Sequence, residues 1–225
     1  MTIRCPICCS RLSFHRVIGD SLAGVWYRLN RSPELMRLAA TRCGKKVAVM
    51  ATTSAAAVAN AFLDIQAADT TQFPPIDQMK LQKLVYYAHA WFLAFNNGDP
   101  LFDEDVFAWP WGPVIPPIYS DFRDFGRDPI AGHRATLLAR SGTGPFDFHI
   151  QTPPPPPAPV MDFLHRLWTT HKGYTGVQLS NATHALGEPW YIVKQQYGTL
   201  DSKPLIPNSL IYDVFRAKLP SPVGA

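Results

Sequence analysis

Residues 79–95 contain neither glycine nor proline and place apolar side chains on nearly every face of a helix. One face carries Leu81, Leu84, Val85, Ala88, Phe92 and Phe95. Two narrow polar stripes interrupt the pattern: Lys80, Lys83 and Tyr87 on one side, and Gln78, Gln82 and His89 on the other. This distribution is typical of a helix packed on more than one side, so we expect a central core helix. The apolar run is far below the roughly 20 residues of a membrane span.

Weaker helical patterns precede this segment. Ser54 is placed to cap a helix that buries Val58, Phe62 and Ile65, which recur at helical spacing. Residues 69–75 then predict a loop that ends in two prolines, and Asp77 is a natural N-cap for the central helix. Residues 96–100 contain the signal that ends the central helix.

The middle of the chain is rich in aromatic residues and proline. Residues 106–109 suit a short strand, which Pro110, Gly112 and Pro113 are expected to break, and a helix is expected from about 116 to 125. The acidic residues 103–105 are interpreted as solvated loop charge, because their spacing differs from that of a calcium loop. Residues 131–150 are interpreted as a connector, and the prolines at 153–157, within a Pro-rich linker at about 151–159, as a stiff spacer.

Helical patterns return in the last third. Residues 160–168 predict an amphipathic helix, and Thr175 and Gln178 have the spacing of a capping box for the next one. That helix is expected to stop near Gly187, Pro189 to open another, and a last helix to run through Phe215. The predicted fold is therefore mainly α, a compact helical domain with a small β element near the middle.

Charge and cysteine divide the chain into an extension at 1–49 and a domain at 50–225. Residues 1–49 carry nine Lys or Arg against two Asp or Glu, whereas residues 50–225 carry twelve against fifteen. The cysteines are Cys5, Cys8, Cys9 and Cys43. With no disulfide framework in the rest of the chain, we expect a reducing, cytoplasmic location.

Three interpretations of residues 1–49 stay open. The preferred one is a disordered extension or translated upstream sequence, with the domain starting at Met50. The second is a metal site made by Cys5, Cys8 or Cys9, Cys43 and His15, for which a single C-x-x-C is a weak signal. The third is a basic arm for targeting or nucleic acid. We expect no metal and no cofactor.

Two separated motifs resemble the Panacea domain, the SocA-like family of antitoxins in bacterial and prophage toxin–antitoxin pairs. The first contains the segments MKLQKL at 79–84, YYA at 86–88, PLF at 100–102, AW at 108–109, WGPV at 111–114 and P-x-x-Y at 116–119. The second contains LS at 179–180, TH at 183–184 and PW at 189–190, and the resemblance covers about residues 52–219. Family members usually have Lys, Arg or Glu before a Tyr-Gly-Pro-Val segment, where this chain has Pro110 and Trp111.

The resemblance implies an antitoxin that binds a cognate toxin encoded beside it, by steric occlusion or as an adaptor that delivers the toxin to a cellular protease. It suggests aromatic anchors for the interface, although each aromatic residue can equally belong to the core. The protein-binding positions implied by the family motifs are Lys80, Gln82, Lys83, Trp109, Trp111, Gly112, Pro113, Tyr119, Thr183, His184 and Trp190.

The residues give no enzyme signature. His184 is the best catalytic candidate, but a histidine beside a turn is expected to hydrogen-bond a helix end or a neighbouring side chain. Lys80 and Lys83 could meet phosphate, but two lysines on one stripe are more typical of a solvated edge or a protein contact. We therefore expect no enzyme, no membrane and no nucleic-acid partner.

Two alternatives from other classes remain. One is a regulatory DNA-binding protein that uses residues 175–197 as a helix-turn-helix, although the second helix is aromatic-rich with a single cation, Lys194. The other is a hydrolase centred on His184, which loss of a measured activity in His184→Ala would support.

Overall fold

The computed structural model describes residues 53–142, 144 and 147–219. The expectations for residues 1–49, including the cysteine metal site and the basic arm, lie outside the described residues. Within that part of the chain, no group of three His, Cys, Asp or Glu side chains is placed to hold a metal ion. None of the described helices is long and apolar enough to cross a membrane.

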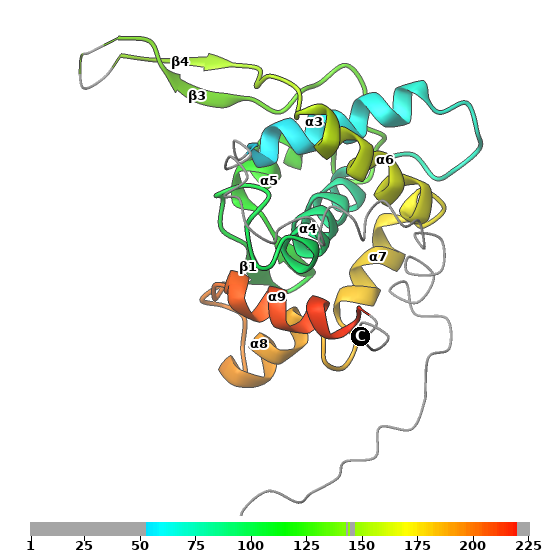
Figure 1. Ribbon diagram of the computed structural model, residues 1–225, viewed down its shortest axis with the longest axis vertical. Coiled ribbons are helices and arrows are strands. Elements are labelled where there is room, and N and C mark those ends of the chain that lie inside the picture. Colours follow the sequence, from blue (N-terminus) through cyan, green and yellow to red (C-terminus); the bar gives the residue numbers. More distant parts are fainter. Residues whose placement is uncertain (1–52, 143, 145–146, 220–225) are drawn as a thin grey trace, which may run out of the picture.

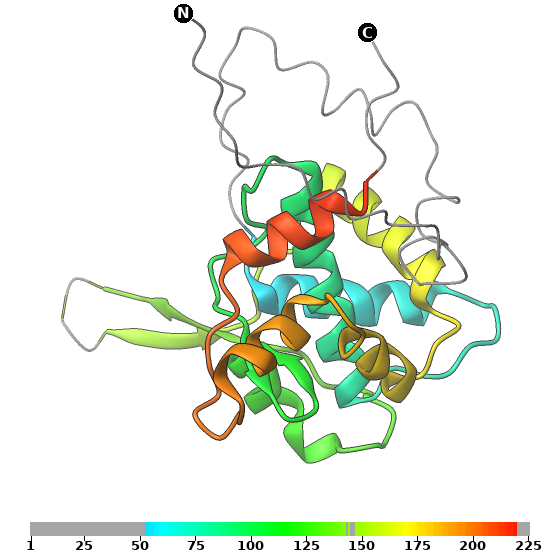
Figure 2. The ribbon, with the colours of Figure 1, turned by 90° about the horizontal axis from the view of Figure 1, so that it is seen from below.

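Helix α4 (Gln78–Phe95) lies at the centre of the helical body (Figures 1 and 2). Its neighbours are α3 (Ala55–Ala68), α5 (Pro116–Phe122), α6 (Ala158–His171), α7 (Gly176–Thr183) and α9 (Asn208–Ala217). Helix α8 (Pro189–Tyr197) contacts α7 and α9, and a 3-10 turn, η1 (Arg123–Phe125), continues α5. The mainly α prediction with a small β element is confirmed.

The predicted central helix is buried on all sides. Its apolar side chains pack against the surrounding helices. Trp91 contacts Phe215 of α9 edge to face, with ring centroids 5.0 Å apart. His89 on a polar stripe is also buried, because its Nε2 lies 2.9 Å from Asn208 Oδ1 and its ring stacks on Phe102. Elements from both ends of the domain therefore cover one helix.

The predicted helix starts are confirmed. The Asp77 carboxylate accepts from the Lys80 N–H at 2.6 Å, and the Ser54 hydroxyl accepts from the Ala57 N–H at 3.1 Å. Thr175 opens α7 with the full capping box. Each cap satisfies a backbone donor that a helix leaves free at its first turn.

The β element is a hairpin. Strand β1 (Phe107–Trp109) was expected, but the following residues do not end the structure: β2 (Gly112–Val114) pairs with it antiparallel. The predicted break after Trp109 is confirmed at Pro110, where the chain reverses over 110–111, but the prediction missed that Gly112 and Pro113 form a second strand. Residues 204–206 line the other edge of β1, where Ala108 N–H donates to the Pro204 carbonyl at 2.8 Å.

A second hairpin replaces the connector expected at 131–150. Strands β3 (Leu137–Arg140) and β4 (Phe148–Gln151) pair antiparallel and extend away from the helices as an arm (Figure 1). Leu138 and Ile150 face each other across the pair and are both exposed. The connector prediction is wrong for 137–140 and 148–151. Residues 148–151 alternate between apolar and polar, but over only four residues, and residues 137–140 do not alternate.

The acidic segment 103–105 matches its prediction in part. Asp103 and Asp105 are exposed, as solvated loop charges are. Glu104 is half-buried instead, and its Oε1 accepts from the Ala55 N–H at 3.0 Å at the start of α3. Glu104 is therefore a second cap for α3, supplied from a segment distant in sequence.

Candidate functional site

Helix α4 holds the β1–β2 hairpin through two polar side chains. Gln82 pairs with the backbone of Ile115, which follows β2: its Nε2 donates to the Ile115 carbonyl at 3.3 Å, and its Oε1 accepts from the Ile115 N–H at 3.1 Å. The next residue along α4, Lys83, donates from its Nζ to the Pro113 carbonyl at 2.9 Å. These bonds give the hairpin backbone partners inside the core, where unpaired groups would be costly.

Helices α7 and α8 bind the same hairpin near its turn. Ser180 Oγ donates to the Trp111 carbonyl at 2.7 Å, and Trp190 Nε1 donates to the Trp109 carbonyl at 2.7 Å. The two family motifs, separated by about sixty residues of sequence, therefore meet at the hairpin. Side chains from three helices fix the position of this turn.

Gly112 allows α4 and α7 to approach the hairpin closely. Its φ is +107°, a conformation that residues with a side chain rarely adopt. A Cβ at this position would lie 2.5 Å from Lys83 Nζ and 2.9 Å from Thr183 Oγ1. Thr183 keeps its hydroxyl there by donating to the Ser180 carbonyl at 2.7 Å. The glycine is therefore required by both backbone conformation and space.

The burial of Lys83 contradicts the expectation of a solvated edge. Its side chain is buried, and burial lowers the pKa of the ammonium to about 7. Its hydrogen bond to Pro113 shows the reason: the hairpin covers the stripe that a helical wheel alone leaves open. Lys83 is a structural link between α4 and β2.

Lys80 is also buried, but it serves a different part of the fold. Its Nζ donates to the carbonyls of Pro74 at 2.5 Å and Lys172 at 2.7 Å, and it lies over the rings of Phe73 and Trp168. Burial lowers the pKa of Lys80 to about 8. The structure thus separates Lys80 from Lys83, and the prediction of a solvated lysine stripe is wrong for both.

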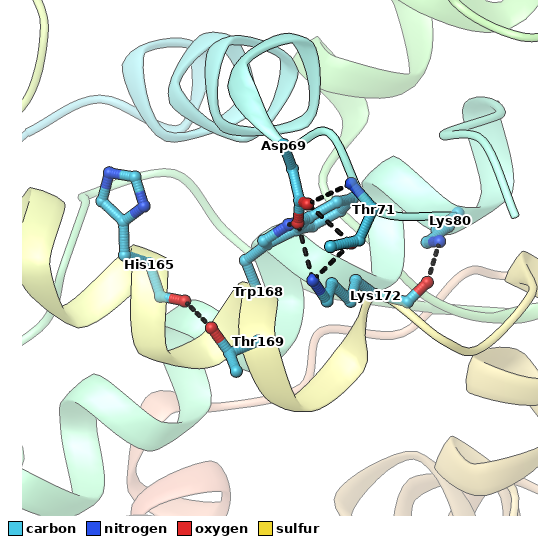
Figure 3. A network of polar contacts seen from close by, with 7 residues as sticks. All are labelled: Asp69, Thr71, Lys80, His165, Trp168, Thr169 and Lys172. Carbon is cyan, nitrogen blue, oxygen red and sulfur yellow. Dashed lines mark hydrogen bonds and ion pairs between the residues drawn. The ribbon is translucent and has the colours of Figure 1, made fainter. Parts of the chain in front are cut away.

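A polar network extends from Lys80 to the end of α3 (Figure 3). Asp69, the C-cap of α3, accepts from Lys172 Nζ and from Trp168 Nε1, both at 2.8 Å. It also accepts from the backbone and hydroxyl of Thr71. The Lys172 ammonium, followed by the Thr71 and Trp168 bonds, holds the pKa of the Asp69 carboxyl far below its usual range. This network ties the loop before α4 to the end of α6.

The aromatic candidates differ in exposure. Trp190 is core, with 3% of its surface exposed, whereas Trp111 at the hairpin turn is 73% exposed. Trp109 and Tyr119 are half-buried, and their rings lie 4.9 Å apart. Lys203 Nζ lies 4.0 Å from the Trp109 ring centroid. Trp111 is therefore the aromatic candidate that is free to contact another molecule over most of its surface.

His184 does not make the side-chain hydrogen bond expected of it. Its backbone N–H caps α7, while its ring stacks on Trp190 with centroids 3.8 Å apart. Its buried Nε2 has no hydrogen-bond partner among the described residues. Burial, with the positive charges of Lys83 and Lys194, lowers the pKa of His184 to about 4. A neutral imidazole stacked in this way has the geometry of a packing residue.

Comparisons with known proteins bear out the family resemblance of the sequence motifs. The family model for the antitoxin SocA-like Panacea domain matches residues 81–191. Antitoxin SocA of Caulobacter vibrioides (strain NA1000 / CB15N) is 34% identical over 145 residues, which cover 64% of this chain and 72% of that protein. The chain belongs to the SocA-like Panacea family. No solved structure matches the chain.

The Panacea match spans most of the site. Residues 81–191 include Gln82, Lys83, both strands of the β1–β2 hairpin and the start of α8. Lys80 and Lys203 lie outside that range. The family motifs pointed to the hairpin and α7, and they included Ser180 without assigning it to the site.

Sequence reasoning missed Ser180, Ile115 and Lys203 as site residues. Ser180 belongs to the second family motif, so the sequence contained a signal for its place in the site. Ile115 takes part through its backbone, which no side-chain pattern reveals. Lys203 reaches Trp109 from a turn near the end of the chain, and no periodicity marks it.

We expect the Panacea domain to lose stability as the pH falls from about 6.5 towards 4. His89 and His171 are buried, and burial lowers the pKa of each from 6.5 to about 4. The unfolded chain therefore binds protons that the folded chain does not, at a cost on the order of 3 kcal/mol between pH 7 and pH 5. Urea unfolding at the two pH values measures this loss.

His171→Asn should reduce this pH dependence, because an amide can still donate to the Leu167 carbonyl that lies 2.9 Å from His171 Nδ1. The exposed His165 is the matched control, and His165→Asn should leave the dependence unchanged. An equal free energy of unfolding at pH 7 and pH 5 would contradict the buried neutral histidines.

Proposed function

We propose that this Panacea protein is an antitoxin that neutralises a toxin encoded beside it through direct contact, centred on the β1–β2 hairpin. Membership of a family named for antitoxin SocA supports the role. The observation that carries the proposed surface is Trp111, which is 73% exposed at a turn that three helices hold in place.

An exposed tryptophan on a fixed turn is suited to a protein interface. Tryptophan is among the residues that dominate binding energy when a partner covers them. Because Ser180 and Trp190 already hold the backbone of the turn, binding there requires little further ordering of the chain. The hairpin thus offers an anchor at low entropic cost.

Neutralisation can follow two routes from the same contact. The antitoxin can occlude the working surface of the toxin, or it can deliver the toxin to a cellular protease. We place occlusion first, because it requires no surface beyond the hairpin. The two routes predict different amounts of toxin in rescued cells, since delivery removes the toxin and occlusion retains it.

Co-expression tests the proposal. The neighbouring open reading frame is placed under an inducible promoter, and the full chain is expressed beside it. We expect the neighbour to stop growth and the full chain to restore it and to co-purify with the neighbour. Constant toxin levels indicate occlusion, and protease-dependent loss indicates delivery. A toxic neighbour that the full chain neither rescues nor binds overturns the proposal.

Trp111→Ser should abolish or strongly reduce this rescue while leaving the midpoint of thermal unfolding nearly unchanged. The side chain is mostly exposed, so its removal costs the isolated fold little, but an interface loses about 2 kcal/mol or more when such an anchor is truncated. Leu138→Ser on the arm is the control, since it removes a comparably exposed apolar side chain at a distance from the hairpin. Equal rescue by both variants would rule out Trp111 as the anchor.

DNA binding has less support as a second function. Helix α8 carries Lys194 as its single cation, and it buries Trp190 and Val193 against the domain. Residues 50–225 carry fifteen acidic against twelve basic side chains. A helix that reads bases needs a cationic surface around it, which this composition does not favour.

A further inference from the structure

Two lysines beside the hairpin have no acidic partner among the described residues. Lys194 Nζ lies 5.2 Å from the ring centroid of Trp190, and Lys203 Nζ lies 4.0 Å from that of Trp109. Neither ammonium forms an ion pair or a hydrogen bond with another residue in the part of the chain that the structure describes. Their charges are therefore available to a partner.

Contacts through two tryptophans connect both lysines to strand β1. Lys203 precedes the segment 204–206 that pairs with β1, and the bridge between Phe107 and Leu205 places it beside Trp109. The Lys194 ammonium lies over the ring of Trp190. The indole N–H of Trp190 donates to the carbonyl of the same Trp109. Contacts through Trp109 therefore link both cations to the hairpin that presents Trp111.

The nearby carboxylates do not neutralise these lysines. Glu188 is held by Lys218, whose Nζ lies 2.6 and 2.8 Å from its two carboxylate oxygens. Asp201 is exposed, and it forms no ion pair with Lys203, two residues away. Free positive charge at this place contrasts with the acidic balance of residues 50–225 as a whole.

Exposed apolar side chains accompany the charges. Trp111 is 73% exposed at the hairpin turn, and Leu186 is 85% exposed in the loop between α7 and α8. Leu186 follows two residues after His184, whose ring stacks on Trp190. We group Trp109, Trp111, Leu186, Lys194 and Lys203, which these contacts link, under the name aromatic–lysine face.

We propose that the aromatic–lysine face binds an acidic segment of a protein partner, one in which carboxylates alternate with apolar side chains. The carboxylates meet Lys194 and Lys203, and the apolar side chains cover Trp111 and Leu186. Each ammonium lies over an aromatic ring, so the charge is oriented before the partner arrives. This inference rests on the proposed function for the partner's identity as a toxin, but the binding chemistry does not depend on it.

Phosphates could also meet two lysines. Nucleic-acid binding, however, draws its affinity from many phosphate contacts, and this face offers two unpaired cations beside a net acidic domain. Apolar side chains as exposed as Trp111 and Leu186 favour a protein instead. Nucleic acid is therefore the competing outcome of the test.

Fluorescence anisotropy with the full chain tests the face directly. The probe is a dye-labelled synthetic peptide of alternating glutamate and leucine, compared with matched peptides that carry glutamine or lysine in place of glutamate. We expect the acidic peptide to bind about tenfold more tightly than either control, with an affinity that falls as salt rises. Equal binding of the acidic and glutamine peptides overturns the inference.

Charge-reversal variants place the binding on the face. We combine Lys194→Glu with Lys203→Asp, because the positive φ of Lys203 tolerates aspartate better than glutamate. The double variant should lose at least about tenfold in affinity for the acidic peptide and keep the thermal midpoint. Arg140→Glu on the arm, a single reversal at a distant exposed cation, should bind as the wild type does.

The outcomes separate this inference from the proposed antitoxin role. If the wild-type chain rescues growth and the double variant binds the acidic peptide as tightly as the wild type does, only the acidic-segment assignment is overturned. If the wild-type chain fails to rescue growth but binds the acidic peptide through both lysines, the antitoxin role is overturned and the acidic-segment assignment of the face stands. A labelled DNA duplex that binds more tightly than the acidic peptide, and loses affinity in the double variant, assigns the face to nucleic acid and overturns the inference.

Discussion

Gly112→Ala is expected to lower the free energy of unfolding by about 4 kcal/mol. Strain at a φ of +107° costs roughly 1–3 kcal/mol for a residue with a side chain. The new Cβ would also lie 2.5 Å from Lys83 Nζ and 2.9 Å from Thr183 Oγ1, and overpacking of this kind costs roughly 1–3 kcal/mol. Urea unfolding of the full chain measures the sum.

Gly132→Ala is the matched control for this substitution. Gly132 also has a positive φ, +68°, but nothing lies within 4 Å of a Cβ added there. It should cost about 1–2 kcal/mol, the penalty for a left-handed residue alone. Equal costs at the two glycines would contradict the close approach of α4 and α7 to the hairpin.

A double-mutant cycle identifies the partner of Gly112. Lys83→Ala removes the side-chain atoms that crowd the new Cβ most closely. The cost of Gly112→Ala should therefore be smaller by about 1 kcal/mol or more in the Lys83→Ala background than in the wild type. Additive costs would show that Lys83 does not limit the space at Gly112.

Lys80→Ala is expected to lower the free energy of unfolding by about 3 kcal/mol. The substitution leaves the carbonyls of Pro74 and Lys172 without their donor, and an unsatisfied buried group costs about 1–3 kcal/mol. It also removes the apolar stem of a fully buried side chain, whose Nζ lies over the rings of Phe73 and Trp168. Denaturant unfolding monitored by tryptophan fluorescence checks the loss.

Lys80→Met separates these two contributions. Methionine keeps most of the apolar stem but donates no hydrogen bond, so this variant should lose about 1–2 kcal/mol. The difference between the two variants measures the packing of the stem. A Lys80→Ala protein as stable as the wild type would show that Lys80 is solvated, as the polar stripe of the sequence suggested.

The sequence predicted the elements that local chemistry determines. Asp77, Ser54 and Thr175 cap helices in the structure because their side chains reach backbone donors only three residues away. The central place of α4 also followed from the sequence, since a helix that is apolar on several faces has to be covered on several sides.

Features that depend on distant segments could not be predicted in this way. The helical pattern gave the spacing of Lys80 and Lys83, but it did not show that the Pro74 loop and the hairpin would cover them. Similarly, Trp111 and Trp190 each follow a proline, yet one is exposed and the other buried. Their exposure depends on how α8 packs against the hairpin.

The arm formed by β3 and β4 also could not be predicted from the side-chain pattern. Strand β4 is exposed along its whole length and β3 is at most half-buried on one face, so burial imposes little pattern on these residues. Hydrogen bonds between the two strands define the arm, and backbone pairing leaves little signal in side-chain polarity. A connector was therefore the natural expectation for residues 131–150.

Backbone hydrogen exchange of the full chain, alone and bound to the purified toxin, tests the central claim most directly. Direct contact at the hairpin predicts slower exchange in the complex at residues 107–114 and 184–194, with the arm at 137–151 unchanged. A complex that protects the arm or another surface, and leaves the hairpin as it was in the free protein, would contradict the proposed site.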